Sequence, residues 1–224
     1  MNRYNKPQIT QAAYLHTASD GITRCRWAGD DLRYQHYHDH EWGRPTQDDI
    51  KLFEKMCLEG FQAGLSWLTI LRKRENFRQA FAGFDFNQII HFDAEDVTRL
   101  LQDAGIVRHR GKINATLKNA HRTLEIVDEF GSLAAYIWQW EAKFPESHIG
   151  KGEYHHPIPS ITQRSQSLSQ DLKRRGWKFF GPTTAYAFMQ AMGLVNDHMQ
   201  GCVCHPIIEG LRENLIRPYS PVSI

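Results

Sequence analysis

Apolar side chains recur every three or four positions along most of this chain, which is the spacing of an amphipathic α-helix. The spacing predicts helices with these apolar stripes: Leu52, Phe53, Met56 and Cys57; Trp67, Leu68, Leu71, Phe77 and Phe81; Val97, Leu100 and Leu101; Ile113, Leu117, Ala120, Leu124 and Val127; the run from Tyr136 to Trp140; Leu168 and Leu172; Tyr186 and Met189. Strand-like alternation is almost absent, and no segment repeats another. The pattern therefore predicts an all-α fold.

Residues that commonly start helices stand before several of these stripes. The candidates are Thr46, Asp48 and Asp49 for the first helix, Asp93 with Asp96 as a capping box, Ser132, Ser165 or Ser167, and Pro182 as a first helical residue. A helix that ends at Gly105 and one that begins near Ile113 enclose a tight turn bounded by Gly105 and Gly111. These signals predict a helix, a turn and a second helix in that region.

The remaining segments show no helical period. Residues 25–45 are dense in aromatic residues and histidines, and we expect a loop-rich cap there. Residues 142–160 contain three prolines and two glycines, which predicts a long surface loop between lobes. Residues 1–22 are expected to be a disordered or extension arm, residues 206–224 a C-terminal tail, and residues 23–205 the one compact domain.

Residues 57–67 place a carboxylate, two glycines and large apolar side chains within eleven positions. Gly60 and Gly64 interrupt two helical patterns, and glycine inside a helix costs about 1 kcal/mol. A carboxylate at the end of one helix and an aromatic ring at the start of the next would form a pocket floor with one acceptor. Glu59 and Trp67 are therefore candidate ligand-binding residues; the alternative is a helix corner with a solvated glutamate.

Composition narrows the class of protein. The chain has 224 residues, 41% of them hydrophobic and 23% charged, as in an ordinary soluble globule, and no apolar run approaches the ~20 residues of a membrane span. The N-terminal segment has no apolar core that would mark a signal peptide, so we expect a cytoplasmic protein without a membrane role. Its four cysteines then indicate thiols or metal ligands.

The net charge does not indicate an anionic partner, but the positions of the basic residues do. The formal net charge is +2, but basic residues cluster at 72–74, 108–112 and 173–175, each beside a predicted helix end. Such clusters fit a nucleic acid. The alternative is a set of solvated helix ends.

Candidate metal ligands lie near both ends of the predicted domain. Cys25 and His38 lie in the aromatic segment, and His198 and Cys202 are four residues apart, which allows both to face one ion. Two sulfurs and two imidazoles suit tetrahedral zinc. Rival donors are Cys204, His205, His36 and His40; the alternative is a set of core thiols and surface histidines.

Several longer motifs resemble the constitutive 3-methyladenine DNA glycosylase I family. They are Arg24-Cys25-x-Trp27, Tyr37-His38-Asp39-x-Glu41-Trp42-Gly43, Leu58-Glu59-Gly60-x-Gln62-Ala63-Gly64-Leu65-Ser66-Trp67, Lys73-Arg74-Glu75-Asn76, the run from Gln102 to Ile113 and the run from Gly193 to Cys202. The resemblance extends from about Arg24 to Cys204. It implies a helix-hairpin-helix glycosylase fold with a structural zinc ion that joins the termini.

The resemblance also implies roles for individual residues. The zinc ligands fall on Cys25, His38, His198 and Cys202. The catalytic carboxylate falls on Glu59, and the base-binding rings on Tyr37, Trp67, Trp27 and Trp42. The DNA-binding positions are Leu65 as a wedge, its neighbour Gly64, and Gly105, Arg110, Gly111 and Lys112 in the hairpin.

Two positions depart from the pattern of relatives. Many helix-hairpin-helix glycosylases carry a catalytic aspartate about twenty residues beyond the hairpin, and Asp128 is the nearest here. The resembling family works without it, so Asp128 receives no role. His40 stands where asparagine is expected, and it would alter hydrogen bonds beside the pocket.

The implied reaction is hydrolysis of the N-glycosidic bond of 3-methyladenine in double-stranded DNA, which leaves an abasic site. No lysine stands in an aromatic pocket motif, so we expect no strand cleavage, and no nucleotide cofactor is implied. 3-Methylguanine is a further substrate to test. Two other classes remain: a catalytically inactive zinc-containing DNA-binding module, and a small-molecule hydrolase that uses the same aromatic pocket.

Overall fold

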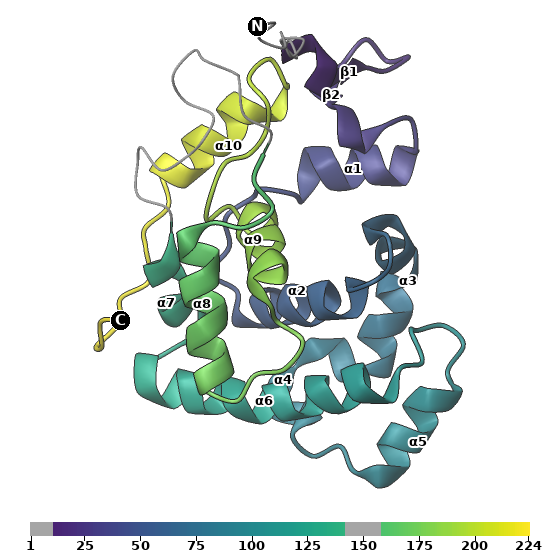
Figure 1. The fold of residues 1–224 in the computed structure, drawn as a ribbon, viewed down its shortest axis with the longest axis vertical. Helices are drawn as coiled ribbons and strands as arrows, with labels where there is room; N and C mark the ends of the chain where they lie inside the picture. The colour runs from purple at the N-terminus through teal and green to yellow at the C-terminus, as the bar shows by residue number, and fades with distance from the viewer. Residues whose placement is uncertain (1–10, 142–157) are drawn as a thin grey trace, which may run out of the picture.

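A computed structural model describes residues 11–141 and 158–224, which form a mostly helical fold (Figure 1). The α-helices are α1 (Leu32–His40), α2 (Asp49–Gln62), α3 (Trp67–Ala80), α4 (Phe86–Ile89), α5 (Ala94–Gln102), α6 (Arg110–Phe130), α7 (Leu133–Ile137), α8 (Gln163–Arg174), α9 (Pro182–Ala191) and α10 (Cys204–Glu213). Strands β1 (Leu15–Thr17) and β2 (Thr23–Cys25) pair antiparallel, with Leu15 opposite Cys25. Short 3₁₀ turns cover Gln11–Tyr14, Arg26–Ala28, Ala82–Phe84 and Trp138–Trp140. The expected helical fold is thus confirmed, with one small sheet added.

Most helix starts follow the expected caps. Asp48 caps α2 by accepting from the amides of Ile50 and Lys51, whereas Ser66, which caps α3, was not among the predicted caps. Asp93 forms the expected capping box with Asp96. Ser132 caps α7, and Pro182 is the first residue of α9. Each cap satisfies amides that the first helical turn leaves without partners, which fixes these boundaries locally.

Helix α2 lies at the centre of the fold (Figure 1). It packs against α3, α6, α7 and α9, and every residue from Leu52 to Phe61 is buried. Its apolar stripe contacts these neighbours on several sides. Its buried polar residues Glu54, Lys55 and Glu59 are all ion-paired, as burial of charge requires. Helix α2 therefore places charged side chains in the interior of the fold, each next to a partner of opposite charge.

The predicted break at Gly60 is wrong, since α2 continues to Gln62. Gly60 serves close packing instead: a Cβ at this position would lie 3.1 Å from the carbonyl oxygen of Phe179. The chain turns at Gly64, which has a φ of +83° that favours glycine. One glycine thus allows contact with another segment, and the other makes the turn.

Two other local expectations differ from the structure. The histidine-rich segment contains a nine-residue helix, α1, capped by Asp31. Its period is hidden because Tyr37 and His38, which are consecutive, are both buried. Helix α8 is capped by Thr162; Ser165 is the third residue of the helix and closes that capping box, so it does not start the helix.

The two flanking segments are partly structured. Within the expected arm, residues 15–17 pair with residues 23–25, and within the expected tail α10 extends to Glu213 with Ile208 and Arg212 buried. The amide of Val203 donates to the carbonyl of Thr23 (2.9 Å), so the segment before α10 lies against β2. Residues 1–10, and the expected loop up to residue 157, lie outside the described residues.

No described helix combines the length and hydropathy that a transmembrane span needs. The helix-turn-helix expectation around Gly105 is confirmed, with α5 ending at Gln102 and α6 beginning at Arg110.

Candidate functional site

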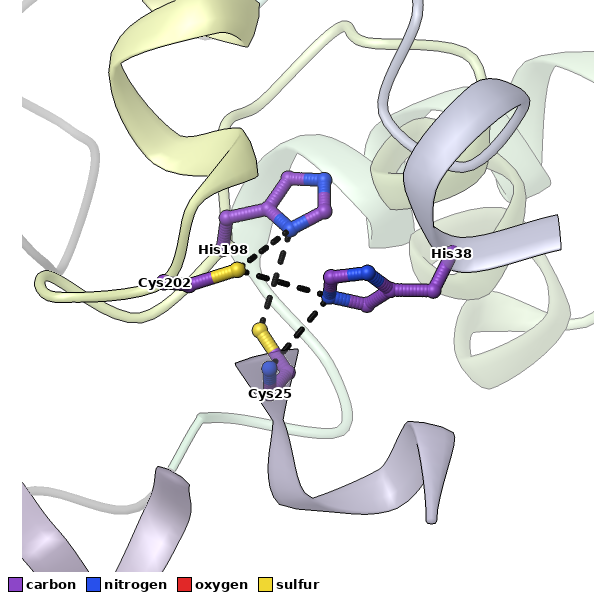
Figure 2. A group of neighbouring side chains, drawn as sticks. All are labelled: Cys25, His38, His198 and Cys202. Atoms are coloured by element: carbon purple, nitrogen blue, oxygen red, sulfur yellow. Dashed lines mark hydrogen bonds between the residues drawn. The ribbon is translucent and has the colours of Figure 1, made fainter. Parts of the chain in front are cut away.

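Four side chains from distant parts of the sequence gather between β2, α1 and the segment before α10. Cys25 ends β2, His38 lies on α1, and His198 and Cys202 lie between α9 and α10. All four are buried, and their ligand atoms lie within 4.8 Å of one another. Figure 2 shows them pointing toward one centre. The structure thus brings together the four residues that the sequence selected.

The distances fit a tetrahedral metal site. Cys202 Sγ lies 3.4 Å from His38 Nε2 and 3.6 Å from His198 Nδ1, and Cys25 Sγ lies 3.7 Å from His198 Nδ1. Tetrahedral zinc with its usual bond lengths would separate sulfur and nitrogen by about 3.5 Å. Hydrogen bonds from Cys204 and Cys25 lower the pKa of Cys202, which favours the thiolate that a metal binds. The group could therefore hold an ion without rearrangement.

The outer ring nitrogens of both histidines have partners. His38 Nδ1 lies 2.7 Å from Asp39, whose carboxylate in turn accepts from Arg24 (2.8 Å). His198 Nε2 lies 3.1 Å from the carbonyl oxygen of Trp42. Such contacts orient the inner nitrogens of metal-binding histidines toward the ion.

The rival donors lie outside this group. Cys204 Sγ lies 3.8 Å from His38 Nδ1, on the outer side of that ring. His36 and His40 stack on each other at 4.4 Å and are exposed, and His205 is half-buried. Cys204 forms a second possible group only with His38 and Asp39, so it belongs to the surroundings of the same site.

An aromatic cavity of about 210 Å³ adjoins the Cys/His group. It is smaller than the ~300 to 1,000 Å³ of drug-sized pockets, which suits a single small ring system. The expected base-binding residues all line it, together with residues that the sequence did not select: Trp27, Tyr34, Tyr37, Trp42, Glu59, Gln62, Trp67, Ile158, Ala187 and Gln190.

The cavity wall and the Cys/His group support each other. Trp27 lies 5.0 Å from Trp42 and 5.1 Å from His38 between ring centroids, and Trp42 lies 4.6 Å from His198. On the other side, Tyr37 lies 5.4 Å from Trp67. Aromatic pairs at these separations stabilise each other beyond their buried area. Loss of order in the Cys/His group would therefore displace Trp27 and Trp42 in the cavity wall.

Glu59 is only 5% exposed, and it has a partner that sequence reasoning missed. Lys55, one helical turn earlier, places Nζ 2.8 Å from Glu59 Oε1 and 2.8 Å from the hydroxyl of Tyr37. The same Nζ lies 3.2 Å from the Trp67 ring centroid. Burial lowers the pKa of Lys55, and the charge of Glu59 opposes that shift. The Lys-to-Glu spacing of four on α2 was the available signal.

Two tyrosines, Tyr34 and Tyr37, are the other titratable residues in the wall of the aromatic cavity, and burial raises the pKa of both. Burial and then the negative charge of Glu59 hold the pKa of Tyr37 well above its usual value, so the phenol stays protonated. The cavity wall thus combines neutral rings with the carboxylate of Glu59, whose partner Lys55 lies outside the lining.

A second cavity of about 310 Å³ lies across Tyr37 and Trp67, which line both. It is strongly charged, with His40, Glu41, Arg44, Lys51, Glu54, Lys55, Arg74 and Arg78 among its lining residues. His40, the departure noted in the sequence, therefore faces this cavity. The carboxylates of this charged cavity, Glu41 and Glu54, are bound to Arg74 and Arg78. The aromatic cavity has more rings in its wall and the carboxylate of Glu59 beside them, so it is the candidate binding site.

Leu65 is exposed at the turn between α2 and α3. It is 43% exposed and follows Gly64, which is itself exposed. Because Gln62 and Trp67 on either side of this turn line the aromatic cavity, Leu65 stands at its edge. The apolar tip is thus placed beside the candidate binding site.

The hairpin residues divide into two sets. Arg110 and Gly111 are exposed at the start of α6, and Gly105 is half-buried before it. Lys112 is 7% exposed, and its Nζ donates to the carbonyls of Phe61 (2.8 Å) and Ala63 (2.7 Å). The expected phosphate contact of Lys112 does not fit this geometry, because the ammonium binds the end of α2.

Known proteins resemble this chain in sequence and structure. A family model described as methyladenine glycosylase matches residues 27–205. DNA-3-methyladenine glycosylase 1 of Escherichia coli K12 is 48% identical over 83% of this chain and 98% of its own. A crystal structure of 3-methyladenine DNA glycosylase I is 49% identical, with a TM-score of 0.75 over 82% of this chain and 100% of that one. A Staphylococcus aureus structure, described as the basis of 3-methyladenine recognition, is 36% identical, with a TM-score of 0.76 over 82% and 96%.

Proposed function

This chain belongs to the methyladenine glycosylase family, and from that premise we propose that it releases 3-methyladenine from alkylated DNA by hydrolysis of the N-glycosidic bond. The products are the free base and an abasic site, which begins base-excision repair. The observation that carries this proposal is the small aromatic cavity with a buried carboxylate, Glu59, in its wall.

The damaged base has to leave the duplex before it can be bound. Rotating a nucleotide out of the stack costs a few kcal/mol. Leu65, exposed at the cavity edge, would fill the space left in the stack. This role rests on its apolar side chain and its position between Gly64 and Ser66.

Charge and shape would select the base. Methylation at N3 gives adenine in DNA a positive charge, which strengthens stacking on the electron-rich rings of Trp67 and Tyr37. Trp27 and Trp42 close the other side of the cavity. Glu59 would accept a hydrogen bond from the exocyclic amino group and complement the ring charge.

The same charge makes the base a good leaving group. The bond between N9 and the sugar carbon breaks, its electron pair goes to the base, and water adds to the sugar carbon and loses a proton. No strong general acid is required. Lys55 does not act as a Schiff-base nucleophile in this proposal, because its ammonium is already bound to Glu59 and Tyr37.

The start of α6 would hold the DNA backbone. We assign Gly105, Arg110 and Gly111 to a helix-hairpin-helix contact, in which backbone amides and the positive end of a helix bind phosphate. Lys112 would support this contact from inside by holding the end of α2. Such contacts position double-stranded DNA without reading its sequence.

We assign a structural zinc ion to Cys25, His38, His198 and Cys202. The donor set, its burial and the sulfur–nitrogen distances support this assignment. The ion would hold the two chain ends together and support Trp27 and Trp42, and it takes no part in the reaction.

We take residues 23–205 as the catalytic unit, with both flanks as extensions, and expect it in the cytoplasm with a bacterial-type chromosome.

Base release from methylated duplex DNA, followed by chromatography, tests the proposal. We expect free 3-methyladenine and intact strands with abasic sites; 3-methylguanine is scored in the same run. Damage binding without base release would indicate an inactive DNA-binding module. Weak DNA binding that is insensitive to salt would indicate a small-molecule hydrolase.

A further inference from the structure

Lys55 lies in the wall between the two cavities. Its side chain lines the charged cavity, while its partner Glu59 lines the aromatic cavity. It is 6% exposed. An ammonium has three donors, and here Glu59, the hydroxyl of Tyr37 and the face of Trp67 are the three partners. The ammonium therefore ties together three residues of the proposed base site.

We infer that Lys55 is a positioning residue of the base site, which holds Glu59 as an oriented anion and so determines the preference for a cationic base. This inference rests on the proposed function of Glu59. Lys55 does not touch the base, since it lies behind Tyr37 and Trp67 rather than among the residues that line the aromatic cavity.

The first argument concerns the cost of burying charge. A carboxylate that is 5% exposed and has no counter-ion takes up a proton rather than remain charged. Lys55 supplies the counter-ion at 2.8 Å through Oε1. Glu59 also lines the aromatic cavity, so its carboxylate would be within reach of a ligand there.

The second argument concerns the other charges nearby. Glu41, which directly follows α1, and Arg74 on α3 lie near Lys55 and are bound to each other, and Glu54 is bound to Arg78. Tyr34 and Tyr37 face Glu59 as neutral phenols, because burial raises the pKa of both. The remaining charged or titratable residues on the far side of Lys55 are His40, Arg44 and Lys51. Lys55 is thus the cation that directly pairs with Glu59 among the described residues.

Single-turnover release of 3-methyladenine, measured from mildly acidic to mildly alkaline pH, tests the inference. In Lys55→Met, Glu59 should take up a proton at acidic pH, so release should fall roughly 10- to 100-fold, toward the rate of Glu59→Gln. As pH rises, the anion returns and release should recover. Lys55→Gln keeps a donor for Tyr37 but has no charge, so its release of 3-methyladenine should show the same pH dependence as that of Lys55→Met.

Three controls separate this effect from simple damage to the fold. Lys51→Met, one turn earlier on the same helix with a 68% exposed side chain, should keep the parental profile. In the Glu59→Gln background, Lys55→Met should add no pH dependence. Melting is measured for every variant.

A measurement on the parent protein keeps the inference testable even if the Lys55 variants do not fold. Calorimetry with 3,9-dimethyladeninium, a permanent cation, in buffers of different ionisation heat counts the protons exchanged on binding. The parent should exchange none. Proton release on binding would overturn the inference, since it would mean that Glu59 was protonated beforehand.

The outcomes distinguish this inference from the proposed function. Lys55 variants whose profiles run parallel to the parent's, while Glu59→Gln loses activity, overturn the inference alone. Parental release by Glu59→Gln removes Glu59 from base recognition, and the inference falls with it. No release by the parent overturns the proposed function itself.

Discussion

At the scale of single residues, sequence motifs identified the residues of the binding site, but not the buried lysine that pairs with one of them. Tyr37, Glu59 and Trp67 were selected from motifs, and all three line one cavity. Lys55 was missed because its role depends on Tyr37 and Trp67, which lie far from it in the sequence. A sequence motif can identify a buried carboxylate such as Glu59. Its counter-ion can be identified only from the folded structure, in which several elements surround it.

Leu65 provides the residue-scale prediction. Leu65→Ala should weaken binding to a duplex that contains an abasic site, because the shortened side chain leaves the vacated stack unfilled. Burying a leucine side chain is worth about 1.5 to 3 kcal/mol, so a loss of roughly tenfold or more is expected. Fluorescence anisotropy at fixed salt measures it.

The matched control is Leu211→Ala on α10. Leu211 is 39% exposed, close to the 43% of Leu65, and it belongs to α10, which lies away from the turn between α2 and α3 (Figure 1). It should bind like the parent. Equal affinities of Leu65→Ala and the parent would show that Leu65 does not enter the DNA.

At the scale of elements, local signals predicted most helices but not their neighbours. Caps such as Asp48, Asp93 and Ser132 act within one helical turn, so sequence alone found them. Helix α10 was taken for a tail because its stability depends on burial, with Arg212 Nε donating to the carbonyl of Gly193 (2.9 Å). The function of Gly60 was likewise invisible without Phe179.

The start of α6 provides the element-scale prediction. Arg110→Ala should weaken binding to any duplex and reduce the salt dependence of log K by about one, because an exposed cation would be lost from the phosphate contact. Lys112→Ala should leave that slope unchanged but lower the melting temperature, because two carbonyls at the end of α2 lose a charged donor.

Binding isotherms over a salt series, together with thermal melting, compare the two variants directly. A reduced slope in Lys112→Ala with unchanged melting would mean that its ammonium leaves the interior to reach phosphate. A parental slope in Arg110→Ala would remove this residue from the DNA contact.

At the scale of the whole molecule, the proposed zinc site joins the two ends of the described fold. The spacing of cysteines and histidines in the sequence allowed several sets of metal ligands, and the resemblance to a family reduced the candidates to four residues. The structure brings the ligand atoms of those four within 4.8 Å, although Cys25 and Cys202 lie at opposite ends of the chain. No local rule predicts that closure, because it depends on how α1 and the segment before α10 meet.

Metal removal provides the whole-molecule prediction. Elemental analysis should find about one zinc per chain, and a strong chelator should lower the melting temperature, because structural metal binding contributes directly to folding. Residual folded protein should keep its excision rate, since the ion takes no part in the reaction. A folded, active preparation that contains no metal would contradict the assignment.

The central claim is that Glu59 in the aromatic cavity recognises the cationic base, and the single-turnover rate of 3-methyladenine release by Glu59→Gln tests it most directly. A hydrogen bond to a charged partner is worth about 1.5 to 3 kcal/mol, so the rate should fall by roughly one to two decades without reaching zero, because the charged base leaves readily by itself. Melting at the parental temperature is the control. Release at the parental rate from a folded Glu59→Gln protein would contradict the account.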